Sequence, residues 1–350
     1  MEEKKMKKLL VLVLAACLSI GLLGGLTVAS ADDVYELNVS FAAPEFSTEG
    51  ITAVLDQIQE ASEGRLKFNY YYSWSLSSVP TVVDDLSSGV VDIAAVPINE
   101  HLNTFTYSNL ITYTPFLPLK GMRETAVMFN ELFNEWECLQ NEYSMLGLHY
   151  WTNYPCPAYN IYTTTDHQIK VPSDMAGLKL ITSSKLMSDF VAANGGAVVN
   201  SPVTDYATNL NTNVVDGVIN HINVLAAFGC LDFLGAVTTF GESGTAMNLM
   251  MMCISQNCWD SLPEDLQALF TDNADALLNA QCDQDTAMSE NNLKNMRESG
   301  VAFTDLTEEE IAVWRDAFDE MRQGYIDELE STGFDQAQEL YDALMEKLAE

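Results

Sequence analysis

Two stretches of the sequence, SSGVVDIAAV at residues 87–96 and NTNVVDGVIN at residues 211–220, repeat one local pattern. Each begins at the end of a predicted helix, continues through Val-Val-Asp and enters a short apolar segment. Continuously apolar strands of this length are typical of the buried interior of a parallel sheet. Because the pattern occurs twice, we expect two similarly built α/β lobes instead of one long sheet.

Strand and helix signals alternate around the first stretch. Apolar patterning predicts strands at 35–41, 66–74 and 90–96, and helical spacing predicts helices at 50–62 and 79–88. This β-α-β-α-β order indicates an α/β domain with helices on both faces of its sheet.

The alternation restarts further along the chain. We expect strands at 145–151, 159–163, 178–182, 198–199 and 214–219, and helices at 184–194 and 204–213. Beyond residue 260 the pattern is helical, to about residue 299, from Thr307 to about residue 329 and from 334 to 348. Thr307 and Glu310 form a predicted capping box. Since no low-complexity linker divides the chain, we expect it to cross between the lobes more than once.

The first 31 residues resemble a secretory signal. Four lysines precede an apolar run from residue 9 to 28, and Ala29-Ser30-Ala31 is a small-residue cleavage site. The alternative is a lipobox that ends at Cys17, which would leave a lipid-anchored N-terminus. We expect a periplasmic protein, soluble after cleavage of the signal, and both kinds of processing stay open.

The chain is strongly acidic, with a formal net charge of −34. The predicted signal contains four lysines and two glutamates, so the mature chain has 12 basic and 48 acidic side chains. Nucleic acids and anionic membranes need clustered basic residues, so neither is expected as a partner.

Six cysteines remain in the predicted mature chain: Cys138, Cys156, Cys230, Cys253, Cys258 and Cys282. Their spacing does not match a zinc site, and no histidine accompanies them. Disulfides and buried free thiols both stay open.

No catalytic motif is present. None of the four histidines lies in an HExxH pattern or accompanies a GxSxG elbow, and no phosphate-binding glycine loop follows a strand. We therefore expect no enzyme, no cofactor and no metal. An exported hydrolase with an acidic pair remains an alternative, because the chain has many carboxylates.

Residues that follow the predicted strands are the candidate ligand contacts, because α/β sheets bind ligands beyond the carboxyl ends of their strands. The candidates are Phe46, Trp74, Asn99, Trp151, Asn153, Tyr154, Thr182 and Asn220. For each aromatic residue the alternative is ordinary core packing. For the asparagines at 99 and 220 it is a strand-end cap or turn.

Four stretches together resemble a known family. They are LSSGVVDIAAV at 86–96, IKVPSDMAGLKL at 169–180, NVVDGVINHI at 213–222 and CWDSLPEDLQALFTDNA at 258–274. In this order and spacing the chain is similar to the solute-binding proteins of TRAP (tripartite ATP-independent periplasmic) transporters, of the dicarboxylate-binding type. The resemblance covers essentially the whole mature chain.

The resemblance implies a two-lobed periplasmic binding protein-like α/β fold with a hinged cleft and a long bridging helix. We expect the signal at 1–31, lobe I at 32–156 plus 247–285, and lobe II at 157–246 plus 286–350. The implied function is capture of a small molecule by a monomer, with delivery to integral membrane transporter subunits. A sensor or scavenger without a transporter is the alternative.

The departures from the family concern the ligand. Ile181 occupies the position where the family usually has an arginine that grips a ligand carboxylate. The family's tyrosine aligns with Ala207, and Tyr206 lies one position away, whereas the family's asparagine is kept as Asn220. Lys185 is a possible substitute for the arginine, as are backbone amides near Ser184. We expect a neutral, cationic or zwitterionic ligand.

Overall fold

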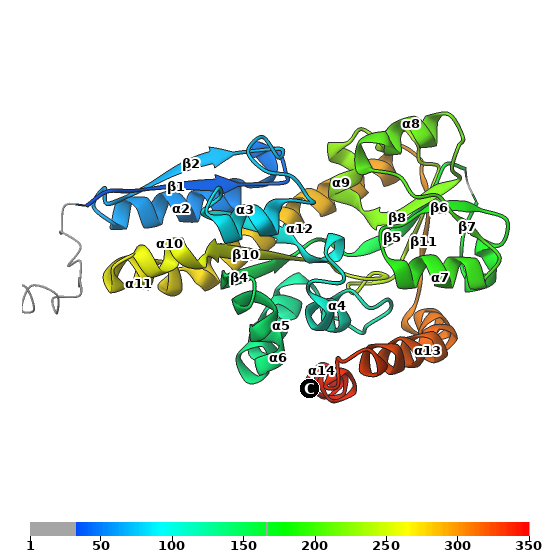
Figure 1. The fold of residues 1–350 in the computed structure, drawn as a ribbon. Coiled ribbons are helices and arrows are strands. Elements are labelled where there is room, and N and C mark those ends of the chain that lie inside the picture. The colour runs from blue at the N-terminus through cyan, green and yellow to red at the C-terminus, as the bar shows by residue number, and fades with distance from the viewer. Residues whose placement is uncertain (1–32, 166, 350) are drawn as a thin grey trace, which may run out of the picture. The chain divides into compact units, whose positions relative to one another are not determined.

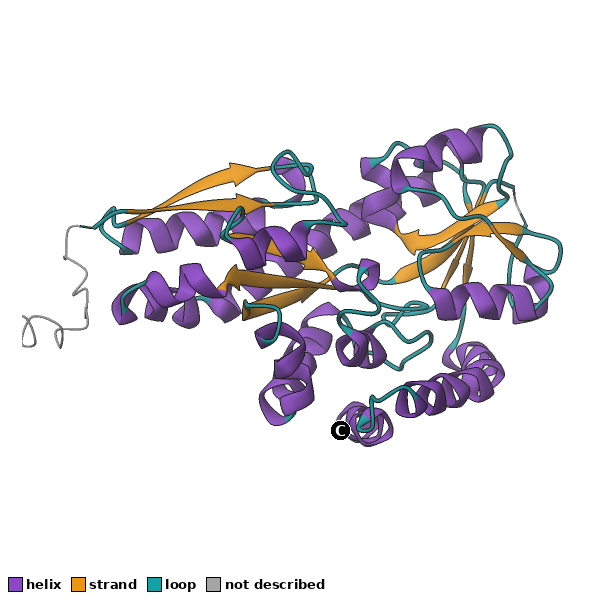
Figure 2. Cartoon of the chain, viewed as in Figure 1, coloured by secondary structure: helices purple, strands orange, loops and turns teal. Residues whose placement is uncertain are grey.

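The computed structural model describes residues 33–165 and 167–349 (Figures 1 and 2). The predicted signal and the alternative lipid site at Cys17 lie outside these residues. Within the described part of the chain, no helix has the length and apolarity needed to cross a membrane. The six predicted mature cysteines are all described, and each is a free thiol.

The first sheet has five strands in the order β2-β1-β3-β10-β4. Their bounds are β1 Tyr35–Ser40, β2 Leu66–Tyr71, β3 Ile93–Pro97, β4 Leu148–Pro155 and β10 Leu249–Ser255. Strands β2, β1 and β3 are parallel, as predicted, but β10 runs antiparallel to both β3 and β4. The sheet is therefore mixed, because β10 re-enters it from the second sheet.

The second sheet has six strands in the order β11-β9-β5-β8-β6-β7. Their bounds are β5 Tyr159–Thr163, β6 Lys179–Ile181, β7 Ala197–Val198, β8 Gly217–His221, β9 Ala236–Thr239 and β11 Ala302–Asp305. Strand β5 is antiparallel to its neighbours β8 and β9, whereas β8, β6 and β7 are parallel. This sheet is also mixed, because β5 enters it directly from β4 of the first sheet and runs antiparallel to its neighbours.

The helices cover both sheets (Figure 2). The α-helices are α2 Glu49–Ala61, α3 Val82–Ser88, α4 Thr106–Thr112, α5 Met122–Glu135, α6 Glu137–Ser144, α7 Lys185–Ala193, α8 Tyr206–Asn211, α9 Ile222–Ala227, α10 Gln256–Ser261, α11 Glu264–Asp272, α12 Ala274–Glu298, α13 Glu308–Ser331 and α14 Ala337–Ala349. The short 3₁₀ helices are η1 Glu45–Ser47, η2 Ile98–Glu100, η3 Pro172–Met175, η4 Val203–Asp205 and η5 Leu231–Phe233. The capping box of Thr307 and Glu310 at the start of α13 is confirmed.

The two Val-Val-Asp stretches occupy equivalent places in the two sheets. The carboxylate of Asp92 accepts a hydrogen bond from the backbone N–H of Asn38 at 2.8 Å. The carboxylate of Asp216 accepts one from the backbone N–H of Lys179, also at 2.8 Å. In each lobe the aspartate thus ties the start of its strand to the neighbouring parallel strand, which explains why the pattern repeats.

Three segments carry the chain between the sheets. Strand β4 continues into β5, β9 leads back to β10, and α12 crosses a third time before β11. Helix α12 contacts α2, β4 and α5 beside the first sheet and α9 beside the second (Figure 1). Together with α11, from which only Asn273 separates it, α12 is the predicted long bridging helix.

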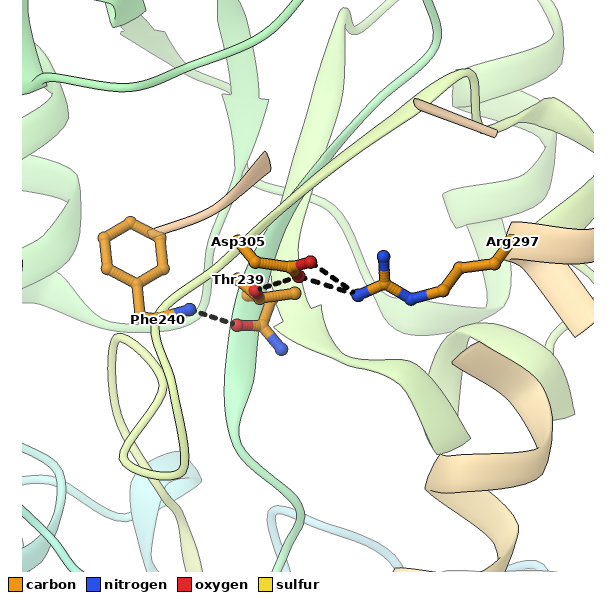
Figure 3. A network of polar contacts seen from close by, with 5 residues as sticks. Thr239, Phe240, Arg297 and Asp305 are labelled. Carbon is orange, nitrogen blue, oxygen red and sulfur yellow. Dashed lines mark hydrogen bonds and ion pairs between the residues drawn. The ribbon is translucent and has the colours of Figure 1, made fainter. Parts of the chain in front are cut away.

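The far end of α12 is fixed to the second sheet by a charged contact (Figure 3). The guanidinium of Arg297 donates to both carboxylate oxygens of Asp305 on β11, at 2.7 and 2.9 Å. The hydroxyl of Thr239 on β9 donates to the same carboxylate at 2.7 Å. The guanidinium also lies 3.7 Å from the centre of the Phe303 ring. These contacts orient α12 against two neighbouring strands.

The C-terminal helices join both halves of the molecule. The first part of α13 buries Trp314 and Phe318 in the core of the second sheet. The end of α13 and the whole of α14 contribute Leu329 and Leu344 to the core of the first sheet. Phe116, from the loop after α4, also packs in the core of the second sheet. The predicted lobe boundaries remain a proposal.

Candidate ligand-binding site

The carboxyl ends of strands β3 and β8 and the beginning of β5 carry a set of polar side chains. Asn99 and Glu100 follow β3 in the short helix η2. Asn220 and His221 end β8, and Tyr159 begins β5 directly opposite His221. Because β5 is antiparallel to β8, its first residue lies at the same sheet edge as the last residues of β8. Residues from both sheets therefore contribute to one candidate site.

Glu100 is the acidic group of this site. Its side chain is exposed, yet the surrounding protein desolvates the carboxylate and raises its pKa. The side-chain amide of Asn99 donates to the carboxylate at 3.3 Å, which lowers the pKa and offsets part of the desolvation.

The negative charge of Glu100 contributes to raising the pKa of three tyrosines. They come from the end of α4, the start of β5 and the start of α8, and they are Tyr113, Tyr159 and Tyr206. All three are buried, and burial followed by nearby negative charge raises each phenol pKa, that of Tyr206 to about 12. The phenols thus stay protonated and neutral at physiological pH.

Direct contacts hold these rings in place. The hydroxyls of Tyr113 and Ser183 lie 2.8 Å apart, which joins the segment after α4 to the segment after β6. The rings of Tyr113 and Tyr159 meet edge to face, with centroids 5.8 Å apart. The ring of Tyr159 in turn lies 5.4 Å from that of His221. The Asn220 side chain is within hydrogen-bonding reach of the Tyr206 hydroxyl.

Two buried polar atoms at this site have no hydrogen-bond partner among the described residues. One is the side-chain carbonyl oxygen of Asn99, a residue that is only 5% exposed. The other is the Nδ1 atom of His221, whose pKa burial lowers to about 3, so that the imidazole is neutral. Unpartnered buried polar atoms are costly, and binding sites are where they are tolerated.

A second buried carboxylate, Asp285, lies on α12. It accepts hydrogen bonds from the side-chain amides of Gln281 at 2.9 Å and Asn223 at 3.3 Å. Burial raises its pKa to about 6. Burial, together with the negative charge of Asp285, raises the pKa of the Cys156 thiol. Asp285 is therefore a buried acidic group that joins α12 to Asn223 of α9.

A groove of about 350 Å³ opens beside Tyr113. It runs between α4, the start of α7 and the end of α13, and its lining residues are Leu102, Asn103, Thr106, Asn109, Tyr113, Thr114, Ser184, Lys185, Leu186, Tyr325, Glu328, Leu329, Thr332 and Phe334. Its volume lies in the range of small-molecule sites. Tyr113 is thus shared between the groove and the cluster around Glu100.

Five residues predicted from the sequence lie at or next to this cluster. Asn99, Tyr206 and Asn220 belong to it directly. Ile181 is buried in the same apolar core as Tyr206. Thr182 is buried beside them, with its hydroxyl 3.4 Å from the backbone nitrogen of Ser184 that donates to it. Their role in ligand binding stays a prediction.

Three predicted residues of β4 lie within the first half of the molecule. The indole N–H of Trp151 donates to the backbone oxygen of Phe270 at 2.7 Å. The side chain of Asn153 donates to Asn130 on α5 at 2.9 Å. Tyr154 is buried in the same apolar core as Trp151. These contacts give the three side chains structural partners.

The last three predicted residues lie at more open positions. Phe46 is 52% exposed in η1, and Trp74 is half-buried after β2. Lys185 is exposed at the start of α7 and forms an ion pair with Asp189 at 2.8 Å. In this conformation Lys185 therefore has a carboxylate partner on its own helix.

Five residues of this region were not among the candidates predicted from the sequence, and they are Glu100, Tyr113, Tyr159, Ser183 and His221. Glu100, Ser183 and His221 follow predicted strands, so the strand-end rule already pointed to them. Tyr159 is the first residue of its strand, and only the antiparallel direction of β5 brings it to the site. Tyr113 is the C-terminal cap residue of α4, a helix that the apolar spacing did not predict.

Within residues 33–165 and 167–349 no group of three or more histidine, cysteine or acidic side chains is arranged to hold a metal ion. The cysteine thiols at 138, 230, 258 and 282 have pKa values raised to between about 11 and 12, chiefly by burial. Such thiols are protonated and unreactive. The arrangement is suited to binding a molecule through a carboxylate, amides and aromatic rings.

Comparison with known proteins identifies the family. The model of bacterial extracellular solute-binding proteins, family 7 (DctP), matches residues 40–328. The 2,3-diketo-L-gulonate-binding periplasmic protein YiaO of Escherichia coli K12 is 22% identical over 255 residues, which cover 72% of this chain and 75% of that protein. A solute-binding protein of Chromohalobacter salexigens is 21% identical over 61% of this chain and 62% of its own length.

Solved structures share the fold. A marine metagenome TRAP solute-binding protein specific for aromatic acids, in complex with 3-hydroxybenzoate, superposes with a TM-score of 0.80 at 18% identity, over 91% of this chain and 98% of that chain. A TRAP solute-binding protein of C. salexigens with bound D-glucuronate gives a TM-score of 0.74 at 16% identity, over 89% and 99% of the two chains.

The predicted resemblance and fold class are thus confirmed, and so is the expectation of a binding protein instead of an enzyme. The match to the family model extends over most of the described residues and includes every strand except most of β1, the bridging helix and the cluster around Glu100. The chain therefore belongs to the bacterial extracellular solute-binding proteins, family 7, the DctP family of TRAP-type solute-binding proteins.

Proposed function

We propose that this protein captures a small organic molecule outside the cytoplasm and delivers it to the membrane subunits of a TRAP-type transporter. The observation that carries the proposal is the cluster around Glu100, to which both sheets contribute. In a two-lobed binding protein such a cluster lies where closure of the lobes encloses the ligand.

We further propose that the ligand is not held by an arginine–carboxylate pair. The relatives with named ligands bind acids, namely 2,3-diketo-L-gulonate, 3-hydroxybenzoate and D-glucuronate. Here Ile181 stands at the family's arginine position, and Lys185 is paired with Asp189. A ligand carboxylate at this site would face Glu100 without a basic partner, at a cost of several kcal/mol.

Native mass spectrometry of the mature protein tests the proposed function. We expect a co-purified small molecule that dissociates on collisional activation. The released compound, added at a hundredfold excess over its Kd, should then stabilise the purified protein by about 2.7 kcal/mol. Failure of every compound in a broad metabolite library to stabilise the protein would contradict a solute-binding role.

Transport itself needs a second experiment. The neighbouring genes for a small and a large multi-span membrane subunit, reconstituted with this protein in proteoliposomes, should take up the identified ligand. Uptake should require both the binding protein and an ion gradient. Ligand binding without uptake would favour a sensor or scavenger.

The site of processing is part of the same proposal. Residues 1–31 are proposed to be removed on export, so that the mature chain begins at Asp32. The intact mass of protein released from the periplasm should match the chain from Asp32. A membrane-bound form with lipid on Cys17 would support the alternative.

A further inference from the structure

We propose that the ligand carries a protonated amine with N–H donors, which Glu100 and Asn99 hold among the three tyrosines of the site. This inference rests on the proposed solute-binding function and names the chemical class of the solute. The observations that carry it are the charge of the site, its aromatic walls and an unpartnered hydrogen-bond acceptor.

The charge of the site is negative and uncompensated. Nine of the twelve basic side chains of the described chain pair with carboxylates elsewhere, and they are Arg65, Lys67, Arg123, Lys185, Lys294, Arg297, Arg315, Arg322 and Lys347. The other three, Lys120, Lys170 and Lys179, are exposed. Glu100 has an amide neighbour in Asn99, but no ion pair is formed with it by any described residue. A cationic ligand supplies the missing charge.

The aromatic walls suit a cation. The charge of Glu100 acts on Tyr113, Tyr159 and Tyr206, and the first two rings meet edge to face with their faces at different orientations. Ammonium groups bind favourably over tyrosine faces, the more so where water is excluded. An anion over the same faces is repelled by the ring quadrupole.

The unpartnered acceptor distinguishes between kinds of cation. The carbonyl oxygen of the Asn99 side chain is buried and has no partner among the described residues, while the amide nitrogen of the same group already donates to Glu100. An acceptor in this position is satisfied by an N–H donor. A primary or secondary ammonium provides such donors, and a quaternary ammonium does not.

Position 181 carries an apolar side chain where the family usually has an arginine. The position is buried in the apolar core that also contains Tyr206. An apolar side chain there leaves the negative charge of Glu100 available to the ligand. An arginine would neutralise it within the protein, as in a site made for carboxylates. Both features favour a cationic ligand: isoleucine in place of the arginine, and a Glu100 carboxylate with which no described residue forms an ion pair.

Two matched series of probes test the inference by calorimetry and thermal shift on the mature protein after removal of bound ligand by exhaustive dialysis. The aromatic series is 2-phenylethylamine, its N,N,N-trimethyl derivative, 2-phenylethanol and 3-phenylpropionate. The aliphatic series is 1,4-diaminobutane and succinate. We expect binding of the amine in at least one series, with weaker binding of its trimethyl, neutral and carboxylate counterparts.

The variant Glu100→Gln keeps the size of the side chain and removes its charge. It should weaken amine binding by about tenfold or more, while its unfolding temperature without ligand stays close to that of the wild type. Glu60→Gln, at an exposed position of α2, is the matched control and should bind the amine like the wild type.

Three results would overturn the inference. They are binding of the carboxylates but not of the amines, equal amine affinity in Glu100→Gln and wild type, and failure of every amine to bind. Equal affinity for the amine and its trimethyl derivative would overturn the role of Asn99. None of these outcomes affects the co-purification experiment, so the inference can fail while the proposed solute-binding function stands.

Discussion

At the scale of single residues, position 181 bears on the proposed class of ligand. Ile181 is 1% exposed and lies at the end of β6 in an apolar core. A charged side chain at such a position is costly unless it finds a partner. The acidic group of the candidate site is Glu100, which we assign to the ligand.

We predict that Ile181→Arg does not improve binding of the native ligand and impairs it. The guanidinium would either stay unpaired, which costs about 3 kcal/mol of stability, or pair with Glu100 and compete with the ligand. Isothermal titration with the co-purified ligand and urea unfolding measure the two effects. Ile181→Leu, which conserves volume, is the control and should cost less than about 1.5 kcal/mol. A gain in affinity with arginine would contradict the assignment.

Glu142 on α6 is a second informative residue. Its carboxylate accepts hydrogen bonds from the backbone N–H groups of Tyr107 and Ser108 at 2.5 and 3.0 Å, and from the Ser108 hydroxyl at 2.7 Å. It thus caps the N-terminus of α4, the helix that ends at Tyr113. Burial still dominates and raises the pKa of Glu142 to about 7.

This shift predicts a pH dependence. Between the ordinary carboxyl pKa and about 7, the folded protein keeps a proton on Glu142 that the unfolded chain has lost, so the contribution to stability falls as pH rises through this window. The free energy of unfolding of the wild type should decrease relative to Glu142→Gln by on the order of 2 kcal/mol between pH 5 and pH 8. Urea unfolding of the wild type and Glu142→Gln at several pH values measures this difference in free energy. The titrating groups that the two proteins share cancel in the comparison. Parallel pH profiles would refute the assignment.

At the scale of elements, the contact between α2 and α12 depends on a glycine. A Cβ on Gly50 would lie 2.7 Å from the backbone oxygen of Ala280. The backbone N–H of Gly50 donates to the side chain of Gln284 at 2.6 Å, and Gln284 in turn donates to the backbone of Phe46 at 2.7 Å. The bridging helix is therefore held against the first sheet by a close backbone approach.

We predict opposite effects of alanine at two helical glycines. Gly50→Ala should destabilise the protein by about 1–3 kcal/mol, because two helices must separate. Gly324→Ala, in α13, meets no atom within 4 Å and should stabilise it by about 0.5–1 kcal/mol through higher helix propensity. Denaturant unfolding of the two variants is the test. Similar effects of both substitutions would show that the approach of α2 and α12 is not tight.

At the scale of the whole molecule, the charge is the dominant property. The chain has 50 acidic and 16 basic residues. Such an imbalance makes the folded state repel itself, and salt screens this repulsion. The surface ion pairs that salt also weakens contribute little individually.

We predict that salt stabilises the protein at neutral pH. Raising NaCl from about 20 mM to about 500 mM should increase the unfolding temperature by a few degrees, corresponding to about 1 kcal/mol. The control is the same titration near the isoelectric point of about 4.1, where the gain should disappear. A decrease of the unfolding temperature with salt at neutral pH would mean that ion pairs outweigh the self-repulsion.

Local features of the molecule could be read from the sequence because they depend on neighbouring residues. The Val-Val-Asp repeats and the helix start at Thr307 are of this kind. Strand β10 was not predicted, because the run LMMMCIS at Leu249–Ser255 is apolar throughout and such a run suits a buried helix as well as a strand. Helices α4, α5 and α6 were missed as well.

The candidate site was decided by tertiary structure. Asn99 and Asn220 follow strands and Tyr206 lies next to the family's tyrosine position, so the sequence could propose them as candidates. Tyr113 and Tyr159 reach Glu100 only because a helix end and an antiparallel strand return to the same sheet edge. The sequence by itself thus determined the family and the fold class. The partners of Glu100 were set by long-range packing, since contacts between segments far apart in the chain leave no local pattern.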